Sequence, residues 1–424
     1  MKARFTSALF GLGLALASLQ HAVAQTPAAV LAATQPIKFA LCYDISKASV
    51  TISLPESQAV RDYAQLLNMG GGIEGHPIEI MLEDHGNEPQ RGIECYEKMK
   101  RAGAITFDFL STPITKALIP RLMKDENVLM SSFIGRSDAI NGEVFKWVFP
   151  IGPTYWAQAA NAIHYIKTQS NNNLKGVKVA FLYADFAFGQ EPIPMLKTLA
   201  ALEGLDLQLF PYAMPGSDQS SAFTQIRHFN PDWVINWGFT GMHEAAAREM
   251  KRNGIAMNKY IAVSWISELN IANIGNDAAK GLKRITSMVA GQESPLIQQI
   301  IKELYAKGKG NGPRETVNNV IYNTGLAVYS PVFEGARLAI KQYGWPITPD
   351  KMRRGLESIR NYDANGLIAP VTVTAKDHGG GGKTRIDMWD GTRYVPQTDW
   401  FSAYGDVVAE IVKKESAEYA RTNP

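Results

Sequence analysis

The sequence lacks the cysteines and the catalytic patterns that mark several large classes of protein. Its 424 residues contain only two cysteines, so the chain is not a disulfide-rich scaffold. It has no Gly-x-Ser-x-Gly nucleophile elbow, no His-x-x-x-His pair and no Cys-x-x-Cys pair. A serine hydrolase and a zinc site therefore have no support in the sequence. We expect a protein that is not an enzyme and that holds neither a metal nor another cofactor.

Charge of one sign and long hydrophobic runs are also scarce. The formal net charge is only +3, from 43 basic and 40 acidic side chains, which gives no reason to expect a nucleic acid or an anionic membrane as partner. Hydrophobic residues make up 46% of the chain, yet no apolar run after the amino terminus reaches the length that crosses a bilayer. We expect a soluble monomer without stable membrane insertion.

The amino terminus has the pattern of a secretory signal peptide. Lys2 and Arg4 precede an apolar run over residues 8–19, and the small residues Ala22-Val23-Ala24 come before Gln25. This order of basic, apolar and small residues predicts a signal peptide over residues 1–24. No cysteine follows the cleavage point to take a lipid, so we expect a freely dissolved protein of the periplasm.

The hydrophobic pattern of the chain repeats, and a chain of this length usually divides into two domains. Short apolar runs typical of buried parallel strands alternate with amphipathic segments typical of helices. The expected strands cover residues 36–44, 78–83, 104–110 and 128–130 in one unit, and 177–183, 206–212, 233–237 and 260–264 in the other. Helices are expected between these strands, at 55–68, 90–101, 115–124, 193–203, 221–229 and 242–253, and later at 295–307, 317–343, 348–359 and 402–419. A hairpin of residues 385–389 and 394–396 is expected around Asp390-Gly391. The pattern predicts an α/β fold with two doubly wound parallel-sheet lobes.

Three crossings between the lobes are expected, near Gly152, Ala290 and Ile368. The first lobe would then take residues 25–151 and 290–367. The second would take residues 152–289 and 368–412, and a tail would follow over residues 413–424.

The two cysteines fall on elements that pack together in a unit of this kind. Cys42 lies in the first expected strand and Cys95 in the second expected helix. Disulfides persist in the periplasm, but the bond needs a specific geometry. A disulfide and two buried thiols both remain open.

Polar and aromatic side chains follow several of the expected strands. Ligands of open α/β sheets bind beyond the carboxyl ends of the strands. Ser111-Thr112 and Ser132-Phe133 follow the third and fourth strands of the first unit, and Tyr183, Asp185 and Phe188 follow the first strand of the second. We expect a ligand site at these strand ends.

Several segments in this order resemble the leucine/isoleucine/valine-binding family of periplasmic solute receptors, which serve ABC importers. The resemblance lies in Ile37 to Asp44, Gly70-Gly71-Gly72 to Ile78, Asn87-Glu88-Pro89, Phe149 to Pro153, Asp185 to Gly189, Gly216-Ser217-Asp218 and Asn230-Pro231-Asp232. It implies two lobes that close on a small solute by hinge motion, with a membrane permease as partner.

The resemblance also implies roles for single residues. Hydroxyls and backbone N–H groups at Ser111, Thr112 and Ser132 would hold a ligand carboxylate. Phe188 would pack on the ligand, as would an aromatic residue after the third strand of the second lobe, which is Trp237 or Phe239.

One position departs from the family pattern. Members that bind amino acids place an acidic residue after the fourth strand of the second lobe, and Trp265 stands at or beside that position here. Glu268 could take the missing role, or the indole could offer a cation–π face. Without either, Tyr43, Tyr155, Tyr183, Phe188, Trp237 and Trp265 would form an aromatic crevice suited to an apolar or aromatic acid.

The sequence thus predicts a periplasmic receptor for a small carboxylate. A branched-chain or other amino acid remains an alternative ligand. A sensory protein that reports its ligand to a membrane signalling partner remains an alternative function.

Overall fold

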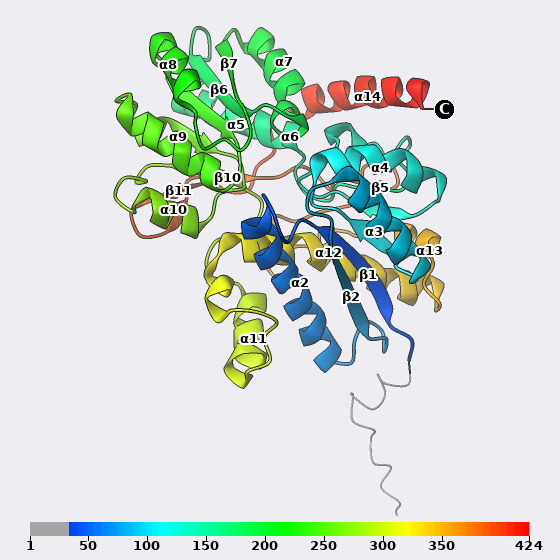
Figure 1. Ribbon diagram of the computed structural model, residues 1–424. Coiled ribbons are helices and arrows are strands. Elements are labelled where there is room, and N and C mark those ends of the chain that lie inside the picture. The colour runs from blue at the N-terminus through cyan, green and yellow to red at the C-terminus, as the bar shows by residue number, and fades with distance from the viewer. Residues whose placement is uncertain (1–33, 424) are drawn as a thin grey trace, which may run out of the picture.

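The computed structural model describes residues 34–423, which form two lobes of similar construction (Figure 1). Each lobe has a sheet of mainly parallel strands with helices on both faces, which confirms the expected fold class. The expected signal peptide and Gln25 lie outside the described residues.

The first lobe contains a five-stranded parallel sheet. Its strand order is β2 (Ile78–Asp84), β1 (Ile37–Tyr43), β3 (Thr106–Asp108), β4 (Val128–Met130) and β5 (Val148–Phe149). α3 (Pro89–Arg101) and α4 (Thr112–Lys124) cover one face, and α2 (Val50–Met69) and α12 (Val320–Tyr343) cover the other. Because both faces are covered, β1 is apolar at successive positions: Phe39 and Leu41 point to one face, Ala40 and Cys42 to the other. The remaining elements here are η1 (Ser137–Ile140), α11 (Pro295–Glu303), η3 (Tyr305–Lys307), η4 (Arg314–Asn318) and α13 (Pro349–Leu356).

The second lobe contains a seven-stranded sheet. Its order is β12 (Tyr394–Pro396), β11 (Arg385–Trp389), β10 (Lys283–Thr286), β9 (Tyr260–Ala262), β8 (Trp233–Trp237), β6 (Lys178–Ala184) and β7 (Asp206–Tyr212), with β11 and β12 antiparallel. α5 (Tyr155–Gln169) and α7 (Ile193–Glu203) cover one face, and α8 (Ser220–Phe229) and α9 (Gly241–Arg252) the other. Three short helices complete it: α6 (Ala187–Gln190), η2 (Met257–Lys259) and α10 (Glu268–Ile274).

The three crossings between the lobes lie side by side. The N–H of Gly152, in the first crossing, donates to the carbonyl of Gly379 in the third, at 2.8 Å. The N–H of Val289, in the second crossing, donates to the carbonyl of Leu367 in the third, at 3.0 Å. The three crossings are therefore neighbours in space.

Several element bounds differ from the sequence prediction. α2 begins at Val50 rather than Pro55, because the carboxylate of Asp44 accepts the backbone N–H groups of Lys47 and Ser49 and closes the turn before the helix. α4 begins at Thr112 rather than residue 115, with Pro113 in its first turn, where a proline costs no helical hydrogen bond. Residues 283–286, just before Ala290 in the expected second crossing, form the strand β10, which pairs with β9 and β11.

The structure decides between the two alternatives for the cysteines. Cys42 of β1 and Cys95 of α3 form a disulfide, with their Cα atoms 6.1 Å apart. Both residues are buried where α3 packs over β1. The bond ties a strand of the first sheet to the helix that covers it.

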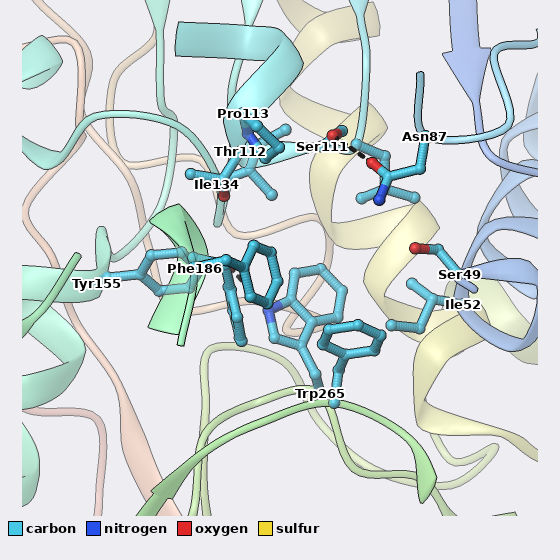
Figure 2. Close-up of a pocket in the computed structure, with 13 residues that line it drawn as sticks. Ser49, Ile52, Asn87, Ser111, Thr112, Pro113, Ile134, Tyr155, Phe186 and Trp265 are labelled. Carbon is cyan, nitrogen blue, oxygen red and sulfur yellow. Dashed lines mark hydrogen bonds between the residues drawn. The ribbon is translucent and has the colours of Figure 1, made fainter. Parts of the chain in front are cut away.

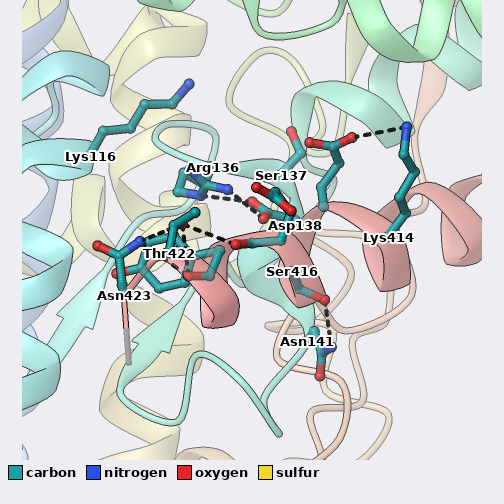
Figure 3. A network of polar contacts seen from close by, with 12 residues as sticks. Lys116, Arg136, Ser137, Asp138, Asn141, Lys414, Ser416, Thr422 and Asn423 are labelled. Carbon is teal, nitrogen blue, oxygen red and sulfur yellow. Dashed lines mark hydrogen bonds and ion pairs between the residues drawn. The ribbon is translucent and has the colours of Figure 1, made fainter.

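The last helix, α14 (Gly405–Thr422), covers most of the terminal helix that we expected over residues 402–419. Figure 3 shows it packed against η1 of the first lobe, where the amide of Asn141 donates to the hydroxyl of Ser416 at 2.8 Å. The ring of Tyr419 lies 4.5 Å from that of Phe145 and beneath the Arg136 guanidinium. At its start, the hydroxyl of Tyr404 donates to Glu203 of α7, so the helix contacts both lobes.

Over residues 34–423, no helix has both the length and the hydropathy needed to cross a membrane.

Candidate functional site

A cavity of about 480 Å³, counting its open mouth, lies between the lobes at the carboxyl ends of the strands. The first lobe lines it with Ser49, Ile52, Asn87, Leu110, Ser111, Thr112, Pro113 and Ile134, and the second with Tyr155, Phe186, Phe188, Phe239 and Trp265.

The start of α4 supplies much of the polar lining. Ser111 precedes the first helical residue, and Thr112 and Pro113 lie in the first turn. N–H groups in that turn have no helical carbonyl to pair with, and the helix dipole makes this end positive, so it suits an anion. The hydroxyl oxygen of Thr112 accepts a long hydrogen bond, 3.4 Å, from the N–H of Gly135. The Thr112 side chain also hydrogen-bonds with the hydroxyl of Tyr155, so these two hydroxyls keep one proton between them for a ligand.

Aromatic rings form the opposite wall, as Figure 2 shows for Tyr155, Phe186 and Trp265. The indole N–H of Trp265 donates to the hydroxyl of Tyr155 at 2.9 Å, which leaves the Tyr155 proton available. Burial raises the pKa of Tyr155, so this hydroxyl stays protonated and can act as a donor. The ring of Phe188 meets that of Tyr155 edge-on at 5.3 Å.

The lining carries no formal charge. None of the thirteen lining residues, all within residues 34–423, is Asp, Glu, Lys, Arg or His. A ligand ammonium would find no carboxylate partner at the wall, and a ligand carboxylate would find hydroxyls and the positive end of α4.

The lobes also touch beside the cavity. Lys116 of α4 forms an ion pair with Glu191, which follows α6 in the second lobe. The same carboxylate accepts the N–H of Ser137 at 2.8 Å. Burial raises the pKa of Glu191, and the pairing with Lys116 opposes that shift. These contacts require the two lobes to lie close together, as they do here.

The structure brings six of the thirteen sequence-predicted site residues to this cavity: Ser111, Thr112, Tyr155, Phe188, Phe239 and Trp265. The other seven do not line it, for reasons that differ from residue to residue.

Three of these seven lie in or beside the first-lobe sheet. Tyr43 is fully buried and its hydroxyl donates to Asp108 at 3.0 Å, so it is part of the lobe core. The hydroxyl of Ser132 lies in the protein interior. Phe133 lines a separate small pocket beside the crossings, with its ring 6.5 Å from that of Trp265.

Three more belong to the second lobe. Tyr183 is buried and stacks on Phe181 at 5.4 Å. Asp185 is exposed and accepts a hydrogen bond from Gln190 at 2.8 Å. Trp237 is fully buried and supports Tyr155 from behind, with ring centres 5.6 Å apart.

Glu268 does not take the role of the missing acidic residue. It begins the short helix α10 and turns away from the cavity, where its carboxylate accepts the N–H of Val320 at the start of α12, at 2.8 Å. A carboxylate at a helix N-terminus is stabilised by the dipole. The Glu268 carboxylate is therefore engaged by the first lobe and does not line the cavity.

The sequence analysis missed seven lining residues: Ser49, Ile52, Asn87, Leu110, Pro113, Ile134 and Phe186. Ser49 and Ile52 were missed because α2 begins earlier than Pro55 suggested. Asn87 and Phe186 stood inside segments that carried the family resemblance, and that position was the one available signal. Within the described residues, no group of three or more His, Cys, Asp or Glu side chains could hold a metal ion.

Comparisons with known proteins agree with this architecture. A family model described as periplasmic binding protein matches residues 36–393. A solved structure from the Pseudomonas fluorescens group, described as an ABC transporter permease, is 28% identical, with a TM-score of 0.85, and the match covers 92% of this chain and 97% of the other.

Two further structures share the fold at 19% identity each. One is a branched-chain amino acid ABC transporter protein from Thermus thermophilus with bound valine, with a TM-score of 0.78 and coverage of 89% of this chain and 99% of the other. The second is a fatty acid ABC transporter substrate-binding protein from Thermomonospora curvata, with a TM-score of 0.75 and coverage of 88% and 94%. Because the family model matches most of the chain and the two-lobed fold is shared, the protein belongs to the type I periplasmic binding proteins, the group that includes the leucine/isoleucine/valine-binding family.

Proposed function

We propose that this protein is the periplasmic receptor of an ABC importer and that it captures a small apolar or aromatic carboxylate in the cavity between its lobes. The observation that carries the proposal is the lining: hydroxyls and a helix N-terminus on one wall, aromatic rings on the other, and no charged side chain. The membrane partner is a permease, as the resemblance to the leucine/isoleucine/valine-binding family implies.

The polar wall supports the carboxylate. Thr112 and Tyr155 hydrogen-bond with each other and accept hydrogen bonds from Gly135 and Trp265, so the pair keeps one hydroxyl proton for donation. Hydrogen bonds to a charged group contribute about 1.5–3 kcal/mol each. One such donor and the N–H groups at the start of α4 can hold one carboxylate.

The same lining argues against an amino acid. A buried ammonium without a carboxylate partner costs several kcal/mol, and every 1.4 kcal/mol is about tenfold in affinity. The aromatic wall instead favours a flat apolar body, because each aromatic pair adds about 0.5–1.5 kcal/mol beyond burial.

Ligand capture would work by closure of the lobes. Three adjacent crossings allow rotation about one axis, and the Lys116–Glu191 ion pair forms only when the lobes meet. Opening must break this contact to admit a ligand.

A thermal-shift screen followed by calorimetry tests the proposal. The panel should contain benzoate, 4-hydroxybenzoate, 3-phenylpropionate, hexanoate, leucine and valine. We expect stabilisation by the acids without an ammonium group, since a ligand stabilises by RT ln(1 + [L]/Kd). Scattering should show a smaller radius of gyration with the bound acid. Tight binding of leucine or valine alone would overturn the ligand class, and an unchanged radius with a bound acid would overturn closure.

A further inference from the structure

The polar wall contains an amide whose role the sequence did not suggest. Asn87 follows β2 and stands at the mouth of the cavity beside Ser111 (Figure 2). The hydroxyl of Ser111 donates to the amide oxygen of Asn87 at 2.8 Å. That bond uses the only proton that Ser111 can donate. Ser111 therefore offers a ligand lone pairs, while both N–H donors of the Asn87 amide remain free.

His85 holds Asn87 in this position. The backbone N–H of Asn87 donates to Nδ1 of His85 at 2.8 Å, and Nε2 of His85 lies 2.7 Å from the carbonyl oxygen of Phe109. A carbonyl can only accept, so Nε2 carries the proton, and Nδ1 must be unprotonated to accept from Asn87. His85 is fully buried, so its ring is fixed in this neutral form by the two contacts.

The backbone of this turn also needs support. Asn87 has a φ of +57° and Gly86 a φ of +52°, both in the left-handed region. The hydrogen bond to His85 is one of the contacts that keep Asn87 in its left-handed conformation.

We propose that Asn87 is a ligand-contacting residue that donates an amide N–H to an oxygen of the bound acid, and that His85 is the positioning residue that holds it there. The inference rests on the proposed function, because it places the acid in the same cavity. It reverses the expected role of Ser111, which orients the amide instead of donating to the carboxylate.

The neutral ring makes this arrangement dependent on pH. Burial lowers the pKa of His85 below its ordinary 6.5, with Arg91 lowering it further and Asp44, Asp84 and the Phe109 carbonyl opposing the shift. His85 is therefore neutral at pH 7 and above. Below its folded pKa, Nδ1 gains a proton that faces the N–H of Asn87, and the contact is lost. Affinity should be constant at neutral pH and above, and fall as the pH drops below the folded pKa of His85, which lies below 6.5.

Calorimetry with 4-hydroxybenzoate tests the role of Asn87. Asn87→Asp keeps the acceptor for Ser111 and the size of the side chain, but it removes both N–H donors and adds a negative charge. We expect its Kd to rise at least about tenfold, the scale of one hydrogen bond to a charged group. Asn172→Asp, an exposed turn residue of the second lobe, is the matched control and should leave the Kd unchanged.

Titrations between pH 7.5 and 5.5 test the role of His85, because an ordinary carboxylic acid, with a pKa of about 4, stays ionised over this range. His85→Asn keeps an acceptor for the N–H of Asn87 but cannot titrate, so it should match the wild type at pH 7.5 and lose the decline at low pH. His85→Leu should bind weakly at every pH. Nitrogen NMR of the His85 ring should show the proton on Nε2 at pH 7.5.

The outcomes separate the two proposals. If the wild type binds no acid of the panel, the proposed function and the role of Asn87 both fail. Acid binding that Asn87→Asp leaves unaltered overturns the inference alone. A ring proton on Nδ1, or a pH dependence that persists in His85→Asn, overturns the role of His85.

Discussion

Replacing Thr112 by valine is the sharpest test of how the carboxylate is held. Valine has nearly the same shape, and Ser111 rather than Thr112 occupies the cap position of α4, so the helix start is preserved. The change removes one of the two cavity hydroxyls, Thr112 and Tyr155, that together keep one proton for the ligand. Loss of a hydrogen bond to a charged group costs about 1.5–3 kcal/mol, so the Kd for an acid such as 4-hydroxybenzoate should rise roughly 10- to 150-fold.

Two control variants make the result specific. Thr112→Ser restores the hydroxyl and should recover most of the affinity. Ser132→Ala should change the Kd by no more than about twofold, within the scatter of a neutral substitution, because its hydroxyl does not line the cavity. Calorimetry gives the Kd, and denaturant unfolding without ligand checks that each variant is folded. A Kd for Thr112→Val within twofold of the wild type, or a large loss in Ser132→Ala, would refute the assignment.

Three further predictions concern selectivity and stability. Leucine and valine should bind at least about a thousandfold more weakly than their analogues without the amino group, because the lining offers an ammonium no carboxylate; submicromolar leucine binding in calorimetry would contradict this. Replacing Cys42 and Cys95 together by alanine should lower the free energy of unfolding by about 4 kcal/mol, the chain-entropy value for a loop of this length, and equal midpoints and slopes in denaturant would count against it. Tyr419→Ala should lower that free energy by about 1–2.5 kcal/mol through loss of the ring and guanidinium contacts that join α14 to the first lobe, whereas Lys413→Ala on the exposed face should not. A Tyr419→Ala variant as stable as the Lys413→Ala variant would mean that α14 contributes nothing through this contact.

The sequence by itself determined the fold class and most of the strands. β4, β7, β8, α7 and the β11–β12 hairpin have the bounds that the pattern predicted. β4 is apolar at every position, as buried parallel strands are, and β7 at the sheet edge alternates between exposed and more buried positions. Asp390-Gly391 fits a tight turn. These signals are local, since each depends on residues next to one another in the chain. The resemblance to a known family added the order of the two lobes.

Only the tertiary structure decided which side chains face the ligand cavity. Five aromatic residues stand at or near the ends of strands. Three of them are packed inside the lobes, namely Tyr43, Tyr183 and Trp237. The other two, Phe188 and Trp265, line the cavity. A strand end brings a residue near the cleft, but the direction of its side chain depends on the helices packed against that strand.

The positions at which helices begin determined which of the remaining side chains line the cavity. An earlier start of α4 puts Thr112 in the first turn beside the cavity, and the short helix α10 turns Glu268 away from it. A seven-residue helix is too short to show a hydrophobic period, and the first turn of a helix is set by capping contacts from distant residues. The contact of Asn87 with Ser111 likewise joins loops that are far apart in sequence, so no local pattern could have predicted it.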